Sequence, residues 1–562
     1  MSALRRLMGT AVSIACALVL CGCSGIPTSG AVQRSDVTVE PPAADIEFLP
    51  ASPELGASPE QILRGFIDAA SSPQNDYAVA REFLSMALNV DWKPNARVIV
   101  DGGSRDYVVT ADGTITLVTQ SQAVVDERGD YSERDIPERV SLTYSFVQEN
   151  GEWRIASAPE GVLLERYTFD QIFGQHALYF FDPTFSLLVP DVRYFPSRAS
   201  TPTRIMKALL AGPSPWLASS GAVVTAFPPD TQLVAETVPI TGTSASVDIT
   251  GNALNSTLEQ KRLMLRQAAA SLSSLSSIFT VQLSIAGVPQ DISAQSEDVQ
   301  KGYPQVDARP LVIADTKFGY LSPSGVIEEI PGISPVVSTF TPWSAAYSDA
   351  HNAAAVNVDE GVMLVRSTGT TLIDGRADLA PAVFDYYGFV WSVPRGKPRD
   401  LLATTTSGVK RLVENAWPTD GRIVSIAMSR DGARIAALME TGGATKLLVS
   451  GISRDGQNGP VAVGEPLVLS VKPGTSTAAV WVDPVTVGVL TTLGDGRVTL
   501  SLNTIGGGVR PVAPSSAGVS LSAGNGVTEV YMRSNENGLF SYRGSGTWPM
   551  VAGNVQVQVQ VQ

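Results

Sequence analysis

The sequence has very little cysteine or histidine, and this scarcity excludes several kinds of site. Its three cysteines, Cys16, Cys21 and Cys23, all lie within the first 23 residues. The rest of the chain therefore has no disulfide, no thiol nucleophile and no cysteine-ligated metal. The only two histidines are His176 and His351. Sites built from several histidines are thus excluded, and a histidine-based catalytic triad would need one of these two.

Positive charge is also scarce. The 562 residues carry 40 Lys and Arg against 54 Asp and Glu, which gives a net charge of −14. This balance argues against nucleic acid as a main partner, because neutralising phosphates needs a basic face. A chain that is 44% hydrophobic and 17% charged builds ordinary packed cores and is neither disordered nor a multi-span membrane protein. Its length predicts three or four domains, and 50 Gly with 37 Pro favour a β-rich architecture.

The first 23 residues have the features of a lipoprotein signal peptide. Arg5 and Arg6 precede a mostly apolar stretch, 7–20, that is too short to span a bilayer comfortably as a permanent helix. It leads into Leu20-Cys21-Gly22-Cys23-Ser24, which resembles the lipobox of bacterial lipoproteins. In a lipobox a small residue precedes the cysteine so that the lipoprotein signal peptidase can cut. The motif predicts removal of residues 1–22.

Cys23 is the predicted lipidation site, with S-diacylglycerol on its thiol and an N-acyl chain such as palmitate. Cys21 is the competing acceptor, but it would place bulky Leu20 before the cut; a plain signal peptide is the other alternative. More than one acyl chain gives stable anchoring. We therefore expect the protein at the extracytoplasmic face of the cell membrane, where ATP- or NAD-dependent chemistry is not expected.

The next segments predict a tether and a first α+β module. Residues 23–57 are rich in Pro, Ser and Ala, which indicates an extended tether. Ser58-Pro59-Glu60-Gln61 is a capping box with proline at the first helical position. A second helical stretch, Tyr77–Met86, precedes strand patterns that end at Gly151-Glu152-Trp153-Arg154-Ile155. Two helices followed by a curved antiparallel sheet are similar to the cystatin and nuclear-transport-factor-like folds, so residues 58–170 are assigned to such a module.

A second α+β module is predicted over residues 171–295. One helix is expected to have Thr201 as its cap and Pro202 first, and to stop at Gly212-Pro213. Another is expected to begin at a capping box, Ser256-Thr257-Leu258-Glu259. Four segments, in this order, resemble the GerMN domain of sporulation and germination proteins: Leu178-Tyr179-Phe180, Leu188-Val189-Pro190-Asp191-Val192-Arg193, Leu209-Leu210-Ala211-Gly212-Pro213-Ser214 and Val247-Asp248-Ile249.

Residues 305–557 predict an all-β propeller. Short apolar strands recur there with related turns near Tyr347, Asp385, Ser429, Asp483 and Gly526, at intervals of 38 to 54 residues. These intervals bracket the roughly 40–45 residues of a four-stranded blade, so five to seven blades are expected. Two packed β-sandwiches are the alternative. A further strand, Leu311–Ala314, is available to close the ring.

Valine and glutamine alternate perfectly in the last eight residues given, Val555 to Gln562. This segment predicts either a strand able to pair at a sheet edge or a frayed end, and we favour the frayed end.

A lipobox, a curved α+β module, a GerMN module and a C-terminal propeller, in that order, resemble the actinobacterial lipoprotein LpqB family. The resemblance implies a role as accessory to the MtrA–MtrB two-component system. It also implies contact with the extracytoplasmic part of the membrane sensor kinase, in cell-wall and osmotic homeostasis. Composition and spacing do not by themselves give this role.

Catalytic signatures are incomplete in this sequence. Gly212-Pro213-Ser214-Pro215 starts like G-x-S-x-G but fails at the fifth position, and we interpret it as a helix stop. No phosphate-binding loop or dinucleotide fingerprint occurs, and Gly506-Gly507-Gly508 is interpreted as a loop. His351, two residues after Asp349, is the most tempting catalytic candidate. We interpret it as a turn residue, and His176 as a packing or surface residue.

Paired carboxylates and aromatic residues give the remaining candidates. Glu133 with Asp135, and Glu328 with Glu329, fit glycoside hydrolysis by residue type only and are interpreted as solvated charge. The Asp-Gly pairs are interpreted as hairpin turns and not as calcium loops. Aromatic residues of the propeller half are expected mostly to fill blade interfaces, although some could line a binding face: Trp343, Tyr347, Tyr386, Tyr387, Trp391, Trp481, Tyr531 and Trp548.

Two functions are therefore carried forward. The first is a non-catalytic, lipid-anchored binding protein that modulates a sensor kinase, with no catalytic, metal or cofactor site and no nucleic-acid partner. The alternative is a cell-wall lipoprotein that binds or processes glycan, with the propeller gripping peptidoglycan or arabinogalactan.

Overall fold

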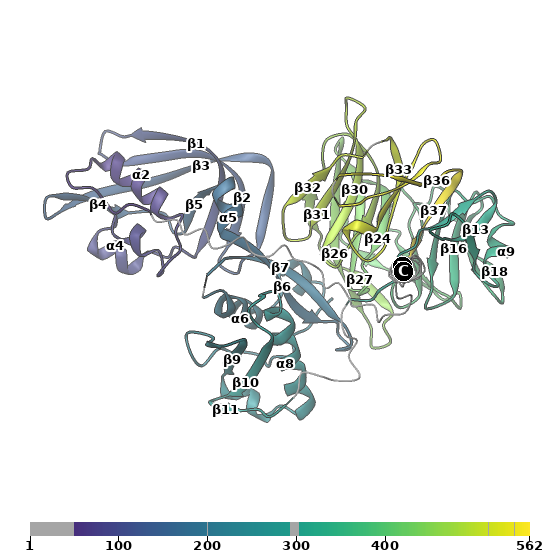
Figure 1. Ribbon diagram of the computed structural model, residues 1–562, viewed down its shortest axis with the longest axis horizontal. Coiled ribbons are helices and arrows are strands. Elements are labelled where there is room, and N and C mark those ends of the chain that lie inside the picture. The colour runs from purple at the N-terminus through teal and green to yellow at the C-terminus, as the bar shows by residue number, and fades with distance from the viewer. Residues whose placement is uncertain (1–49, 199, 293–302, 515, 545) are drawn as a thin grey trace, which may run out of the picture. The chain divides into compact units, whose positions relative to one another are not determined.

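The computed structural model describes residues 50–562 apart from 199, 293–302, 515 and 545 (Figure 1). The predicted signal peptide, Cys23 and most of the predicted tether lie outside the described residues. Among the residues drawn as ribbon, no helix is both long enough and apolar enough to span a bilayer. Three folded bodies follow one another along the chain, and we call them the first module, the second module and the propeller.

The first module packs helices against a five-stranded sheet of order β4-β3-β2-β1-β5, in which β5 runs parallel to β1 and the other neighbours are antiparallel. Its core holds the apolar face of α2 together with Tyr77, Trp92 and Tyr144. The elements are α2 (Pro59–Ala69), α3 (Ala78–Arg81), α4 (Met86–Asp91), β1 (Arg97–Val109), β2 (Ile115–Asp126), β3 (Tyr131–Glu149), β4 (Glu152–Ser157), β5 (Val162–Glu165) and α5 (Arg166–Ile172).

The start of α2 confirms the predicted capping box. Ser58 Oγ accepts from the N–H of Gln61, whose side chain accepts from the N–H of Ser58. The second predicted helix is wrong in extent. Tyr77 has a left-handed backbone with φ 60°, so the chain turns before the four-residue α3. Ser85 then caps a separate helix, α4.

The second module combines the antiparallel ribbon β6–β7 with a sheet of order β11-β10-β9-β8, in which β9 and β10 are parallel. Helix α8 connects these two parallel strands. The elements are β6 (Phe173–Phe181), β7 (Leu188–Pro196), α6 (Thr201–Ala211), α7 (Pro215–Ala218), β8 (Ile240–Thr241), β9 (Ser244–Ile249), the 3-10 helix η1 (Gly251–Asn255), α8 (Leu258–Leu272), β10 (Thr280–Ile285) and β11 (Val288–Pro289).

Both predicted caps in the second module shift by one residue. Helix α8 is capped by Thr257 with Gln260, and not by Ser256 with Glu259. Helix α6 has Ser200 in the cap position. The Thr201 hydroxyl is instead turned back to the carbonyls of Pro196 and Arg198, and it therefore holds the preceding loop. The predicted stop is confirmed, because α6 ends at Ala211 directly before Gly212.

The propeller has six blades in the described residues, within the predicted range, and its strand order rules out a pair of sandwiches. Five blades are β15–β18, β19–β22, β24–β26 with β28, β29–β32 and β33–β36; the sixth is β12–β14 with β37. The strands are β12 (Leu311–Ala314), β13 (Lys317–Leu321), β14 (Ile327–Glu329), β15 (Ser344–Ser348), β16 (Ala353–Val358), β17 (Gly361–Arg366), β18 (Gly369–Asp374), β19 (Val383–Phe384), β20 (Phe389–Ser392), β21 (Leu402–Thr405), β22 (Lys410–Leu412), β23 (Glu414–Asn415), β24 (Arg422–Met428), β25 (Arg434–Thr441), β26 (Ala444–Arg454), β27 (Pro460–Val463), β28 (Leu467–Ser470), β29 (Thr475–Trp481), β30 (Thr486–Thr492), β31 (Val498–Thr504), β32 (Val509–Val512), β33 (Gly518–Ala523), β34 (Val530–Ser534), β35 (Leu539–Ser541), β36 (Met550–Ala552) and β37 (Val555–Val561). Two short helices, α9 (Ser334–Val337) and η2 (Val527–Glu529), lie between strands.

The prediction that residues 555–562 form a frayed end is wrong. Residues 555–561 form β37, which pairs antiparallel with β12 and in parallel with the first strand of the next blade, β15. Figure 1 shows this yellow strand inserted beside the teal strands of the propeller. Val555, Val557 and Val559 are buried. Alternation therefore marks an inner strand here, because one set of its side chains fills the core while the backbone closes the ring.

Candidate functional site

The ribbon β6–β7 is shared between two cores. Phe173 and Tyr194 pack in the core of the first module, whereas Leu178 and Val189 pack in the core of the second. Between these ends, β7 carries two charged residues, Asp191 and Arg193, in an otherwise apolar strand. Because buried charges must be paired, their partners identify what this ribbon contacts.

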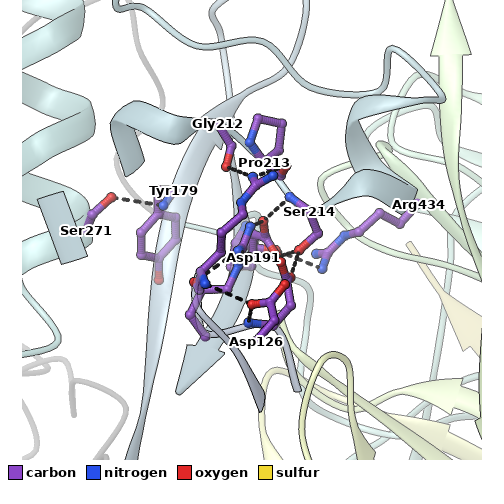
Figure 2. Close-up of polar contacts among 12 residues, drawn as sticks. Asp126, Tyr179, Asp191, Gly212, Pro213, Ser214, Ser271 and Arg434 are labelled. Carbon is purple, nitrogen blue, oxygen red and sulfur yellow. Dashed lines mark hydrogen bonds and ion pairs between the residues drawn. The ribbon is translucent and has the colours of Figure 1, made fainter. Parts of the chain in front are cut away.

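Figure 2 labels Asp191 and Ser214, two members of a buried polar cluster that we call the junction cluster. Arg193 lies within this cluster. Its side chain is fully buried and forms ion pairs with Asp130 at 2.8 Å and with Asp191 at 2.7 Å. Ser214 closes the cluster: its hydroxyl oxygen lies 2.6 Å from an oxygen of each carboxylate. Burial raises the pKa of Asp130.

The β2–β3 turn of the first module supplies the other side of this junction. Arg128 donates to the carbonyls of Gly212 at 2.8 Å and Pro213 at 2.9 Å. Tyr194 N–H donates to the carbonyl of Gly129 at 2.9 Å. Gly129 has φ +83°, and a Cβ there would lie 2.9 Å from the Tyr194 carbonyl oxygen. Only glycine fits both the left-handed backbone and this close approach.

The propeller meets the second module through a second buried ion pair. Arg434 and Asp431 are fully buried and paired, and the Arg434 guanidinium lies 4.7 Å from the ring centre of Trp481. The same guanidinium reaches the carbonyl of Pro190 in β7 at 3.5 Å (Figure 2). Nearby, a Cβ at Gly464 would lie 2.5 Å from Ser220 Cβ, so the two bodies are in close contact there.

Sequence reasoning did not find this junction as a site. It used Asp191, Arg193 and Ser214 only as parts of a resemblance and interpreted Gly212-Pro213 only as a helix stop. The available signal was the pair of charges within an apolar strand, since charge of this kind is buried only when paired. Their partners come from distant segments, so the sequence could not name them.

Two cavities lie along helix α6. A groove of about 770 Å³ and an adjoining one of about 620 Å³ share Lys207, Ala211 and Glu236. By contrast, the axis of the propeller encloses about 30 Å³, and the interior of the first module about 10 Å³. The last two volumes hold at most a few water molecules.

The two histidines have local structural roles. His351 Nδ1 lies 3.0 Å from Ser348 Oγ within its own turn, and Ser348 is 1% exposed. A substrate could therefore not reach that hydroxyl. His176 Nδ1 lies 3.1 Å from Ser274 Oγ, and its ring stacks on Phe195. Burial lowers the pKa of His176 to about 4.

Of the candidate carboxylate pairs, the first is described only at Glu133, because the side chain of Asp135 lies outside the described residues. Glu133 is paired with Arg166 at 3.3 Å, and burial raises its pKa. Glu328 is paired with Arg309. Glu329 follows it directly on strand β14, so the two side chains point to opposite faces of the sheet. Within the part of the chain that the structure describes, no three His, Cys, Asp or Glu side chains gather as a metal site would need.

The propeller aromatics fill interfaces in most cases. Of the eight named from the sequence, Trp343 is exposed, at 44%. Tyr386, Tyr387 and Tyr531 are half-buried. The other four, Tyr347, Trp391, Trp481 and Trp548, are buried. A stacking platform for sugar rings would need several exposed aromatic faces together.

The recurring turn residues also have structural roles. Asp385 accepts from the indole N–H of Trp391 at 2.9 Å and is paired with Arg454 at 2.8 Å. Ser429 donates to Asp431 and to the carbonyl of Arg434. These turns follow the first strands of their blades, β19 and β24, which line the closed axis. The recurrence seen in the sequence is therefore the repeated end of the inner strands.

Family models match three stretches of the chain. The model described as "Lipoprotein LpqB, N-terminal domain" matches residues 52–170, and "Lipoprotein LpqB beta-propeller domain" matches residues 322–559. Between them, a model described as "Sporulation and spore germination" matches residues 177–291. The expected multidomain fold, with a GerMN module and a propeller, is thereby confirmed.

Curated relatives carry the same name. Lipoprotein LpqB from Cutibacterium acnes is 30% identical over 290 residues, which cover 51% of this chain and 48% of that relative. Lipoprotein LpqB from Bifidobacterium longum is 24% identical over 482 residues, which cover 80% of each chain. Among solved structures, TolB from Acinetobacter baumannii is 15% identical with a TM-score of 0.33, over 45% of this chain and 66% of that one.

The two LpqB models together span more than half of the chain, and they flank the germination-type model in the order that the structure displays. Relatives named as lipoproteins LpqB align over most of the same length. The chain belongs to the lipoprotein LpqB family.

Proposed function

We propose that this protein is a non-catalytic binding protein, anchored through Cys23 at the extracytoplasmic face of the cell membrane. It binds the extracytoplasmic part of a membrane sensor kinase of the MtrA–MtrB type and modulates its output. The junction cluster is the observation that carries this proposal. A protein that transmits a binding event needs modules that are held to one another.

The energetics of the junction support such a role. Arg193 is fully buried and its two carboxylate partners belong to different modules, so separating the modules would leave a buried charge unpaired. Losing one partner of a buried ion pair costs about 3–5 kcal/mol. Arg434 adds a second buried contact, to Pro190 in β7. These contacts would therefore pass a displacement of one module to the next.

The surroundings of the candidate catalytic residues favour binding over catalysis. His351 has a serine partner that is buried, and Glu133 and Glu328 are neutralised by arginines. These groups hold local structure, and they do not face a shared cavity. A binding role needs only an exposed surface and a fixed scaffold.

The alternative function, binding or processing of cell-wall glycan by the propeller, has less support. The propeller axis has room for a few water molecules, and most of its aromatic residues lie in interfaces. Sedimentation of the protein with purified cell walls tests this alternative directly. Pelleting with peptidoglycan or arabinogalactan, or release of soluble sugar, would favour it over the kinase partner.

In-cell crosslinking tests the proposed partner. A photoreactive residue is placed at Tyr167, Phe279 or Trp343, exposed positions of the first module, the second module and the propeller. Recovery of a sensor kinase by mass spectrometry from one of these positions is expected. Cys23→Ala is the matched control: it should release the protein from membranes and lower the yield. The proposal fails if the membrane-anchored protein crosslinks to no membrane protein from any position.

A further inference from the structure

The larger groove lies along one face of α6. Its wall from the helix is Ser200, Thr203, Arg204, Lys207 and Ala211, at the three- and four-residue spacing of a single helical face. The opposite face, Ile205, Met206 and Leu209, is fully buried in the second module. The facing wall comes from the first module, with Gln74, Asn75 and Asp76 and with the β2–β3 turn. The groove is therefore built between two modules whose contact is fixed by the junction cluster.

Three arginines of this groove have no carboxylate within ion-pair distance among the described residues: Arg128, Arg198 and Arg204. Arg128 is held by the carbonyls of Gly212 and Pro213, which leaves Arg198 and Arg204 as the two that could face a ligand. Arg198 donates to the carbonyl of Pro73 and lies 5.7 Å from the ring centre of Tyr77, contacts that orient its guanidinium without neutralising it. Arg204 has no ion-pair partner, and burial together with the charge of Arg198 lowers its pKa to about 10. In a chain of net charge −14, leaving two neighbouring arginines unpaired is an arrangement that an anion would stabilise.

The remaining groove residues indicate what kind of anion fits. Lys207 is held only by a 3.3 Å surface pair with Glu236, which is 95% exposed and easily displaced. The first turn of α6 adds the positive end of a helix dipole. Asp76 is occupied by Arg81 at 2.7 Å. Glu127 and Glu236 would repel a ligand with many charges, but they can accept hydrogen bonds from hydroxyl groups. A ligand with one phosphate and several hydroxyl groups fits this groove, because it carries little negative charge and can donate hydrogen bonds to the two glutamates.

We propose that the α6 groove binds a polyol phosphate, with Arg198, Arg204 and Lys207 around the phosphate and Glu127 and Glu236 accepting from its hydroxyl groups. The same chemistry occurs in soluble sugar or glycerol phosphates and in the headgroup of a phospholipid. The groove volume of about 770 Å³ exceeds the size of a phosphate ion and accommodates the polyol. This site is independent of the kinase partner, so either proposal can fail alone.

Binding is measured on the full-length lipoprotein in a nonionic, phosphate-free detergent at low salt. The probes for calorimetry are inorganic phosphate, glycerol 3-phosphate, inositol 1-phosphate and a dihexanoyl phosphatidylinositol. We expect at least one polyol phosphate to bind at least tenfold more tightly than inorganic phosphate. Equal affinity for the free headgroup and the lipid would assign a soluble source, and a clear preference for the lipid would assign a phospholipid.

Variants separate a built site from general attraction to cations. Arg204→Gln and Arg198→Gln should each weaken binding tenfold or more, whereas Arg497→Gln, which removes an exposed and distant arginine, should leave it unchanged. Glu127→Gln should weaken polyol phosphates more than inorganic phosphate. The inference is overturned if no polyol phosphate binds, if inorganic phosphate binds equally well, or if Arg497→Gln and Arg204→Gln have the same effect. Far-ultraviolet circular dichroism confirms that each variant is folded.

Discussion

Arg193 gives the most direct test of the junction between modules. The substitution Arg193→Met keeps much of the side-chain volume but removes the charge between Asp130 and Asp191. Both carboxylates are largely buried, with side-chain exposures of 22% and 3%. Removing one partner of a buried ion pair costs about 3–5 kcal/mol, because the remaining charge cannot reach water.

A matched exposed pair sets the baseline. Arg64 and Glu60 are also 2.8 Å apart, but their side chains are 51% and 45% exposed. Such surface pairs contribute about 0.3–0.5 kcal/mol. Arg64→Met should therefore cost roughly a tenth as much as Arg193→Met, although the two ion pairs have nearly the same length. Burial is the main source of this difference, although Arg193 also has two carboxylate partners, whereas Arg64 has one and lies 3.9 Å from the ring centre of Tyr107.

Hydrogen exchange followed by mass spectrometry is the suitable assay, because a multidomain chain has no single unfolding free energy. Arg193→Met should speed exchange in peptides of the β2–β3 turn and of β6–β7 by about two orders of magnitude or more, and leave peptides of β29–β32 unchanged. Adding Asp130→Asn and Asp191→Asn should recover part of the protection. If Arg193→Met changes exchange no more than Arg64→Met does, the junction cluster does not hold the modules together.

Four further predictions concern other parts of the molecule. His176 has a pKa lowered to about 4 from an ordinary 6.5, so the unfolded chain binds more protons between these values. The stability of the second module should fall by about 3 kcal/mol as pH drops through this window. Hydrogen exchange of β6 peptides, corrected for the intrinsic pH dependence of exchange, should show this loss, and His176→Asn should abolish it. Gly464→Ala places a Cβ 2.5 Å from Ser220 Cβ and should weaken the contact between the propeller and the second module by about 1–3 kcal/mol. Hydrogen exchange at α7 should become faster. Gly456→Ala, which has open space around it, should leave that exchange unchanged. Arg204→Gln should stabilise the second module of the ligand-free protein by about 1–2 kcal/mol, because it removes a half-buried charge that has no ion-pair partner among the described residues. Hydrogen exchange of α6 peptides should slow accordingly, and faster exchange would contradict our account of the groove. Truncation after Gly553 removes β37 and should abolish the cooperative thermal unfolding of the propeller. Tryptophan fluorescence monitors this transition. A cooperative transition at the wild-type temperature would show that the ring does not depend on this strand.

Local signals in the sequence predicted local structure well. The capping box at Ser58 depends on four adjacent residues, and it forms as expected. The cap of α8 was misplaced by one residue because Ser256 and Thr257 are both good caps, each with a suitable partner three residues later. In the structure the cap is Thr257.

Features that depend on distant segments could not be predicted in the same way. Val555–Val561 was expected to fray because its partner, β12, lies near the start of the propeller. The junction cluster joins Asp130, Arg193 and Ser214, and no spacing rule relates these three positions. The recurring turns are different. Each turn residue belongs to the inner strand of a single blade, so the turns recur once per blade along the sequence, and their spacing predicted the blades.

The closure of the ring by β37 has a consequence for how this protein becomes folded after synthesis. Strand β12 emerges early, yet its partner residue for Leu311 is Val559. At roughly 5–20 residues per second, the interval between the two is on the order of tens of seconds. During that interval the blade that contains β12 has an unpaired strand edge, the kind of surface on which chains aggregate. Delivery of the last strand is therefore the committing step in folding of the propeller, and the nearly complete, open ring is the state that most needs protection from aggregation.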